Sequence, residues 1–104
     1  MKAENEIIEL VRGSGNVFHD HNDPDADVLQ MKSLLAARII KLLDEQGLST
    51  RAAHKETGIA AADFSRIRNA DLSRFSVDRL VRIVNKLGEH VTASLSFDNA
   101  VAMH

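Results

Sequence analysis

The sequence predicts a single, mostly α-helical domain that ends in one β-strand. Through most of residues 24–87, apolar residues recur at intervals of three and four, as on one face of an α-helix. Glycines at positions 47, 58 and 88 interrupt this pattern, and glycine is the residue that most often ends a helix. After Gly88 the apolar residues alternate with polar ones, a period of two that is typical of a strand.

The composition fits one small cytoplasmic domain. The chain has 104 residues, of which 44% are hydrophobic, and no cysteine. A chain of this length forms one domain with a limited core. It contains no apolar run long enough to cross a membrane and no basic-then-apolar start typical of a secretory signal. We therefore expect a soluble protein of the reducing cytoplasm, without disulfides.

Residues 1–23 are expected to form a partly flexible N-terminal segment. A small apolar group, Ile7 to Val11, lies in an acidic setting before the break Gly13-Ser14-Gly15. Its few residues are compatible with an edge strand, a short helix or a segment that becomes ordered on binding. We expect the domain proper to span residues 24–97 and a frayed tail to follow at 98–104.

The first predicted helix runs from Pro24 to about Gln46. Asp23 is a suitable N-cap, and Pro24 suits the first helical turn. Gly47 ends the helix. The expected core-facing stripe comprises Val28, Met31, Leu35, Ile39 and Leu42, and it is widened by Leu29, Ala36, Ile40 and Leu43.

Two short helices with a tight turn between them follow. The first spans Ser49 to Thr57, with Ser49 as its cap and Gly58 in a left-handed position after it. The second runs from about Ala61 to Asn69, where Phe64 and Ile67 lie on one face and polar residues lie on the others. This arrangement is typical of a helix-turn-helix, which places its second helix in the DNA major groove.

The last predicted helix spans about Val77 to Leu87, with Ser76 as its N-cap and Gly88 beyond its end. The predicted strand covers Val91 to Phe97. A lone strand has unpaired edges and needs a partner. The partner is expected to be the segment Ile7–Val11 or the same strand of a second subunit, and the second option gives a two-fold dimer.

Several segments resemble the Cro/C1-type (XRE) helix-turn-helix family. The end of the second short helix, Phe64 to Asn69, resembles the family's S-R-I-x-N run. The stretches Leu72–Leu80 (LSRFSVDRL) and Gly13–Phe18 (GSGNVF) are similar to segments of the branch that contains the antitoxins of host-inhibition-of-growth (HigA-type) toxin–antitoxin pairs. The resemblance covers roughly residues 13–95. It implies a lambda-repressor-like helical bundle that represses transcription as a homodimer on a two-fold operator, and a small basic toxin as a second partner.

The resemblance also implies a set of residues that contact DNA. Arg66 and Ser65 are the leading candidates for reading bases, because an arginine can donate two hydrogen bonds to guanine. Arg68 and Arg74 are expected to contact phosphates, with Arg51 supporting them. Alternatively, each arginine forms only a solvent-exposed salt bridge, for example Arg66 with Asp63. The full candidate set is Arg51, Ala61, Ala62, Ser65, Arg66, Arg68, Asn69 and Arg74.

Four positions depart from the family pattern. Ala61 and Ala62 replace residues that commonly carry hydrogen-bonding groups, so that they offer only methyl contacts with thymine. Ala60 is a poor N-cap where the family usually has Ser or Thr. His54 takes the place of a small residue that packs beneath the second helix; either Ala53 makes that contact or His54 is exposed.

The charge is sorted along the chain. Residues 48–88 carry eight basic and four acidic side chains, whereas residues 1–47 carry five basic and nine acidic ones. A positive field around the helix-turn-helix favours attraction to phosphate. The acidic first half, especially Glu4 to Val11, is the expected site for a basic toxin. The alternative is an ordinary solvated surface of mixed charge.

No pattern in the chain favours an enzyme or a cofactor. The group His19, Asp20, His21 and Asp23 is the only one that suggests a metal site, and it lacks a complete ligand set. We therefore expect no metal, no cofactor and no enzymatic activity. The predicted function is a sequence-specific, autorepressing transcriptional regulator of the antitoxin type. The alternative is a protein-interaction module that keeps the helix-turn-helix fold and binds a toxin but not DNA.

Overall fold

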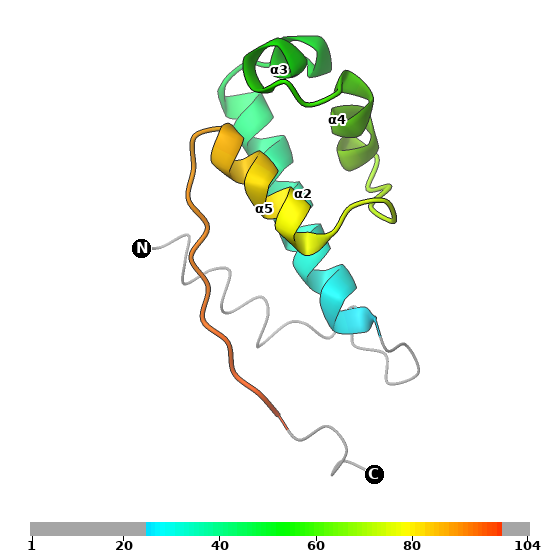
Figure 1. The fold of residues 1–104 in the computed structure, drawn as a ribbon, viewed down its shortest axis with the longest axis vertical. Coiled ribbons are helices and arrows are strands. Elements are labelled where there is room, and N and C mark those ends of the chain that lie inside the picture. Colours follow the sequence, from blue (N-terminus) through cyan, green and yellow to red (C-terminus); the bar gives the residue numbers. More distant parts are fainter. Residues whose placement is uncertain (1–24, 99–104) are drawn as a thin grey trace.

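Four helices arranged around one small core make up the structure, a computed structural model that describes residues 25–98 (Figure 1). They are α2 (Ala26–Glu45), α3 (Thr50–Thr57), α4 (Ala61–Arg68) and α5 (Val77–Lys86). α2 packs against α5 and α4, and α3 packs against α4. The predicted helices are therefore confirmed to within two residues at each end, and the helix-turn-helix is the pair α3 and α4. Asp23 and Pro24, the predicted start of the first helix, lie outside the described residues.

The core lies where α4 and α5 cross α2. Phe64 and Ile67 of α4 and Leu80 of α5 are fully buried against Ile39 and Leu43 of α2. Burial of an aliphatic or aromatic side chain stabilises a domain by about 1.5–3 kcal/mol, so this contact region supplies much of the stability. The rest of the core comprises Ala36, Leu42, Ala53, Leu72, Phe75, Ile83, Val84 and Leu87.

The first turns of α2 extend beyond the other helices, which corrects the predicted core stripe. Val28, Leu29 and Met31 are 41%, 39% and 36% exposed, although their spacing predicts burial for Val28 and Met31. α2 has 20 residues and α5 has 10, which correspond to lengths of about 30 Å and about 15 Å. A helix twice as long as its neighbour extends past it at one end. In Figure 1 this is the N-terminal end of α2, where Val28, Leu29 and Met31 are exposed although Ala26 and Gln30 are buried.

Side-chain hydrogen bonds cap the starts of α3 and α5 at the residues that the sequence predicts. Ser49 accepts from the Ala52 amide at 3.1 Å and Ser76 accepts from the Arg79 amide at 3.2 Å, so both predicted N-caps are confirmed. The Ser76 hydroxyl also donates to the Asp78 carboxylate at 2.6 Å and, with Arg82, lowers the pKa of Asp78. Ala60 provides no side-chain cap for α4.

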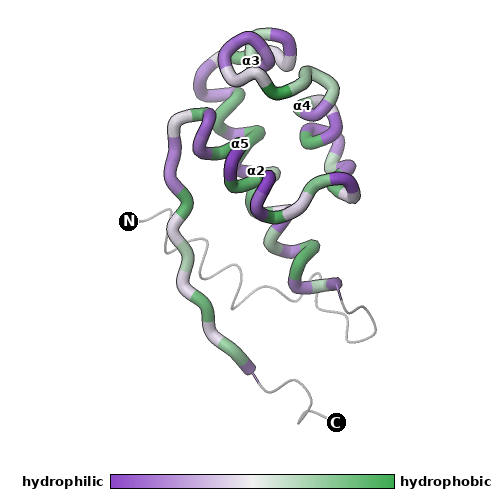
Figure 2. Tube along the Cα trace, in the orientation of Figure 1, coloured by the Kyte–Doolittle hydropathy of each residue, from purple (hydrophilic) through white to green (hydrophobic). Residues whose placement is uncertain are grey.

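The predicted C-terminal strand is not formed in the described chain. Residues 91–98 form neither helix nor strand, because no described segment lies beside them to complete a hydrogen-bond ladder. The alternation itself remains visible along this segment (Figure 2). Val91 packs against the core, whereas Leu95 and Phe97 are 68% and 87% exposed. The alternative partner, Ile7 to Val11, lies outside the described residues.

None of the described helices combines the length and the apolar composition that a membrane span requires.

Candidate nucleic-acid interface

The turn between α3 and α4 is held by side chains as well as by backbone. Gly58 adopts a left-handed conformation (φ 80°), and its amide donates to the His54 carbonyl at 2.7 Å. The Thr57 hydroxyl donates to the Ala53 carbonyl at 2.7 Å and accepts from the Ile59 amide at 3.1 Å. These bonds bridge the turn on both sides, so the orientation of α4 relative to α3 is fixed locally.

The structure shows how α3 accommodates His54 at the position where the family usually has a small residue. Ala53 is fully buried between α3 and the core, and His54 is exposed. The His54 ring pairs through Nδ1 with the Ile59 carbonyl at 2.9 Å, which requires a proton on that nitrogen because a carbonyl oxygen only accepts. The His54 ring thus adds a fourth hydrogen bond across the turn.

Four of the candidate residues share the outer face of α4. Phe64 and Ile67 point into the core and leave the opposite side open. With 3.6 residues per turn, that side carries positions 62, 65, 66 and 69. Ala62, Ser65 and Asn69 are exposed, and the Arg66 side chain is 32% exposed. Ala61 is half-buried at one flank of this face.

The three remaining candidates are arginines outside this face. Arg68 lies at the flank of α4 and pairs with Asp44 of α2 at 2.8 Å. Arg51 on α3 and Arg74 in the loop after α4 are exposed and form no ion pair with a described residue. Exposed pairs such as Arg68 with Asp44 are worth about 0–1 kcal/mol, so separation of Arg68 from Asp44 costs little free energy.

Asp63 makes the ion pair that was raised as an alternative for Arg66, and it makes a second one. Arg66 Nη1 lies 2.8 Å from Asp63 Oδ1, and Arg79 Nη2 of α5 lies 2.6 Å from Asp63 Oδ2. The spacing of Asp63 and Arg66 on one helix indicates the first pair. The second joins residues 16 positions apart, and no local pattern predicts it.

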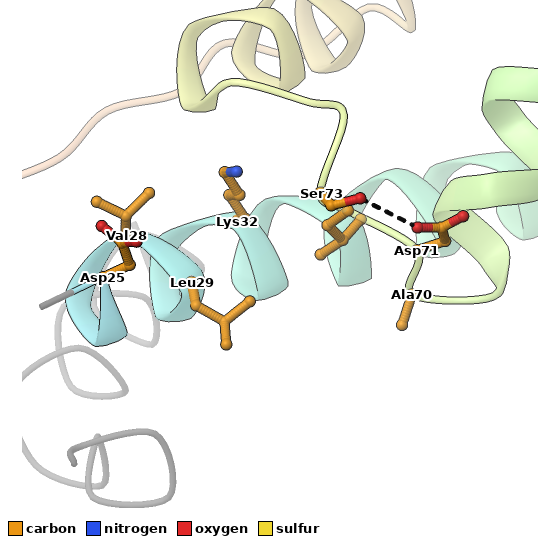
Figure 3. Close-up of a pocket in the computed structure, with 8 residues that line it drawn as sticks. Asp25, Val28, Leu29, Lys32, Ala70, Asp71 and Ser73 are labelled. Carbon is orange, nitrogen blue, oxygen red and sulfur yellow. Dashed lines mark hydrogen bonds between the residues drawn. The ribbon is translucent and has the colours of Figure 1, made fainter. Parts of the chain in front are cut away.

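A shallow groove of about 530 Å³ lies apart from α4, between the exposed first turns of α2 and the loop after α4 (Figure 3). Its lining mixes apolar side chains of α2 and of the loop with charged and small polar groups. Among residues 25–98 no group of three or more metal-ligating side chains occurs. The predicted His19–Asp23 group lies outside these residues. The groove is lined by Asp25, Val28, Leu29, Lys32, Ala70, Asp71, Leu72 and Ser73.

Comparison with known protein families matches residues 17–96 to the family described as helix-turn-helix domain. This match covers most of the chain, and the protein belongs to that family. Membership indicates a DNA-binding regulator, and such domains are typically not enzymes. Comparisons with curated proteins and with solved structures gave no match.

Proposed function

We propose that the protein is a sequence-specific DNA-binding transcriptional regulator that inserts α4 into the major groove. The observation that carries this proposal is the outer face of α4, on which Ala62, Ser65, Arg66 and Asn69 lie together opposite the buried Phe64 and Ile67. A helix fixed by its inner face and polar on its outer face suits the groove, which admits one α-helix.

The outer face offers chemistry for reading a few base pairs. Arg66 donates two hydrogen bonds to guanine O6 and N7, and Asn69 suits adenine N6 and N7. Ser65 donates to or accepts from either kind of base edge. Ala61 and Ala62 contribute methyl contacts with thymine, so hydrogen-bond readout is concentrated on the second half of α4.

Arginines around α4 supply attraction to the phosphates. Arg51 on α3 and Arg74 after α4 are exposed, and Arg68 joins them when it leaves Asp44. Each phosphate that such a group neutralises releases counterions, which makes binding weaker as salt increases. Phosphate contacts of this kind set the register of the helix without reading sequence.

The regulator acts as a homodimer on a two-fold operator, with half-sites about one helical turn apart. The segment 91–98 supports this part of the proposal, because its backbone is unpaired by any described residue and Leu95 and Phe97 are exposed. Pairing of two such segments about a two-fold axis forms a ladder and covers the apolar side chains.

By resemblance, the protein is a cytoplasmic antitoxin that represses its own promoter. A small basic toxin would bind the acidic N-terminal segment, and the domain would span residues 24–97 between that segment and a tail at 98–104. The competing function is a protein-interaction module that binds a toxin without binding DNA. Ala60, Ala61 and Ala62 favour it, because the start of α4 lacks hydrogen-bonding side chains.

Fluorescence anisotropy distinguishes the two functions. The whole protein is titrated into labelled duplex from its own upstream region and into a random duplex, at ~50 and ~200 mM salt. A regulator prefers its own site and loses about tenfold or more in affinity over that salt range. Arg66→Ala with Arg68→Ala should weaken binding steeply, whereas Lys41→Ala, which removes an exposed cation beside Glu89, should not. Absence of binding at the lower salt would refute the regulator and favour the interaction module.

A further inference from the structure

We propose that Asp63 is a positioning residue for DNA reading: held by Arg79 of α5, its carboxylate orients Arg66 so that α4 selects guanine. This inference rests on the proposed function and names the contact from which selectivity arises. It is carried by the two ion pairs of Asp63, which connect the outer face of α4 to the core of the domain.

Asp63 is the most enclosed charged group of the interface. Its side chain is 13% exposed, compared with 32% for Arg66 and 46% for Arg79. Each carboxylate oxygen accepts from a different arginine, at 2.8 Å from Arg66 and 2.6 Å from Arg79. Because both oxygens are engaged, the Asp63 carboxylate has little freedom to rotate. The Arg66 guanidinium that is bonded to this carboxylate is restrained with it.

Arg79 is itself anchored to the core. Its guanidinium carbon lies 5.3 Å from the centroid of the Phe75 ring, within the range of a cation–π contact. Phe75 is 1% exposed and belongs to the core cluster. A continuous series of contacts therefore runs from the core through Phe75, Arg79 and Asp63 to Arg66. The orientation of Arg66 is thus determined by tertiary structure as well as by its own helix.

The held guanidinium keeps one edge available for a base. Arginine has five N–H donors in a planar fork, and the described contacts of Arg66 use Nη1. The edge formed by Nε and Nη2 can donate to the two acceptors of guanine, O6 and N7. Adenine presents an amino donor in place of O6, so the same edge meets a donor there and is rejected. A guanidinium that is already oriented also loses less rotamer entropy on binding.

Asp63 affects affinity and selectivity in opposite directions. Its negative charge opposes the attraction of α4 to phosphate, so its removal should strengthen binding to any sequence. Its removal should also release Arg66 and weaken the preference for guanine. A residue that merely maintained the fold would weaken both properties together, and this difference makes the inference testable.

The test is selection from a pool of duplexes with a randomised centre, using the whole wild-type protein, Asp63→Asn and Asp71→Asn. Asp71 is an exposed acid just beyond α4 whose amide bonds to the Arg66 carbonyl but whose side chain bonds to Ser73, so Asp71→Asn removes the same charge nearby and keeps the backbone bond. We expect the wild type and Asp71→Asn to enrich a guanine at one position of each half-site. Asp63→Asn should lose that enrichment by about tenfold or more, the discrimination of one bidentate pair. Its binding to random duplex should be equal to or tighter than that of the wild type.

A double-mutant cycle shows whether Asp63 acts through Arg66. In an Arg66→Ala background, Asp63→Asn should cause no further loss of guanine enrichment. An unchanged sequence profile for Asp63→Asn, or equal losses in both backgrounds, would overturn the inference. A wild type without sequence preference would instead overturn the proposed function. If circular dichroism shows that Asp63→Asn is unfolded, Arg79→Gln removes the anchor and leaves the pair of Asp63 with Arg66. Retention of full guanine enrichment by that variant would equally contradict the inference.

Discussion

Arg38 of α2 and Glu89, just after α5, form a two-pronged ion pair, with Nε and Nη2 each 2.5 Å from a carboxylate oxygen. The pair joins the middle of the longest helix to the point where the extended segment 91–98 begins. Asn85 donates to the Glu89 carbonyl at 2.9 Å, and Gln46, the C-cap of α2, donates to the Leu87 carbonyl at 2.9 Å. The direction in which the C-terminal segment leaves the domain is therefore set by side chains of α2 and α5.

This ion pair predicts a pH-dependent contribution of Glu89 to stability. Arg38, through its hydrogen bonds and then its charge, lowers the pKa of Glu89 below its ordinary value of 4.5, and Lys41 adds to the effect. A carboxylate whose pKa is lower in the folded state stabilises the protein above pH 4.5, and the contribution is lost as the pH falls through the folded-state pKa. Glu89→Gln should cost up to about 1 kcal/mol at neutral pH, because both side chains are about one-third exposed.

Urea denaturation of the wild type and Glu89→Gln at several pH values checks this expectation. The difference in the free energy of unfolding should be constant at neutral pH and should shrink below pH 4.5. The exposed Glu56→Gln is the matched control and should not change the profile. A gap between wild type and Glu89→Gln that persists unchanged in acid would show that the carboxylate charge is not responsible.

Substitution of Ala70 by glycine is expected to stabilise the domain. Ala70 has φ 58°, and it follows α4 in a Schellman arrangement in which the Ala70 amide donates to the Ile67 carbonyl and the Asp71 amide to the Arg66 carbonyl. A left-handed alanine is strained by about 1–2 kcal/mol, and glycine relieves that strain but has a more flexible unfolded chain, which costs about 0.4–1 kcal/mol. Ala70→Gly should therefore stabilise the domain by about 0.5–1 kcal/mol.

Thermal unfolding followed by circular dichroism measures this change, and a rise of a few degrees in Tm is expected. Ala37→Gly, at an exposed position within α2, is the matched control and should destabilise by about 1 kcal/mol. If both substitutions lower Tm, the conformation of Ala70 is not a source of strain.

The local pattern predicts the helices and their caps because it depends on neighbours within a few residues. Ser49, Ser76 and Gly58 act through bonds that span three or four positions. By contrast, Val28 and Met31 follow a correct helical period but are exposed, since burial depends on how far the partner helices reach. The length of the packing partner is a property of the tertiary structure, and periodicity within α2 does not contain it.

The candidate interface shows the same division. The outer face of α4 follows from the spacing of Phe64 and Ile67, so its residues are predictable from sequence. The connection of Asp63 to Arg79 joins residues 16 positions apart on two helices and depends on how α4 and α5 each pack against α2. Likewise the left-handed Ala70 carries no sequence signal, because glycine or asparagine is the residue expected there. The alternation of residues 91–97 predicts a strand, but its formation requires a partner that one chain does not offer in residues 25–98.

Removal of the Thr57 hydroxyl is expected to destabilise the turn between α3 and α4. Thr57→Val keeps the shape of the side chain but removes the bond to the Ala53 carbonyl and leaves the Ile59 amide without its acceptor. The expected cost is about 1–3 kcal/mol, because a partly buried donor loses its partner. DNA affinity should fall as well, since α4 is no longer fixed relative to α3. Urea midpoints and anisotropy measure the two effects, and Thr50→Val on the same helix is the control. Unchanged stability would mean that the hydroxyl does not maintain the turn.

The exposed Leu95 and Phe97 of the C-terminal segment lead us to expect a dimer whose contact is made by the face of the segment that carries these two side chains. Leu95 and Phe97 alternate with Ser94 and Ser96, so the two pairs point to opposite faces if the segment pairs as a strand. Leu95→Asn with Phe97→Asn should convert the protein from dimer to monomer, whereas Ser94→Asn with Ser96→Asn should leave it dimeric. The two double variants carry the same new side chains, and only the face differs.

Sedimentation and DNA binding read out this comparison. The Leu95 and Phe97 variant should sediment as a monomer and should lose affinity for a two-half-site duplex while binding a single half-site as the wild type does. That loss arises because a monomer engages the second half-site without the advantage of a tethered partner. A variant that remains dimeric would place the dimer contact elsewhere, and the exposed Val28, Leu29 and Met31 of α2 would then be the next surface to substitute. Equal effects of the two double variants would show that the segment does not pair as a strand.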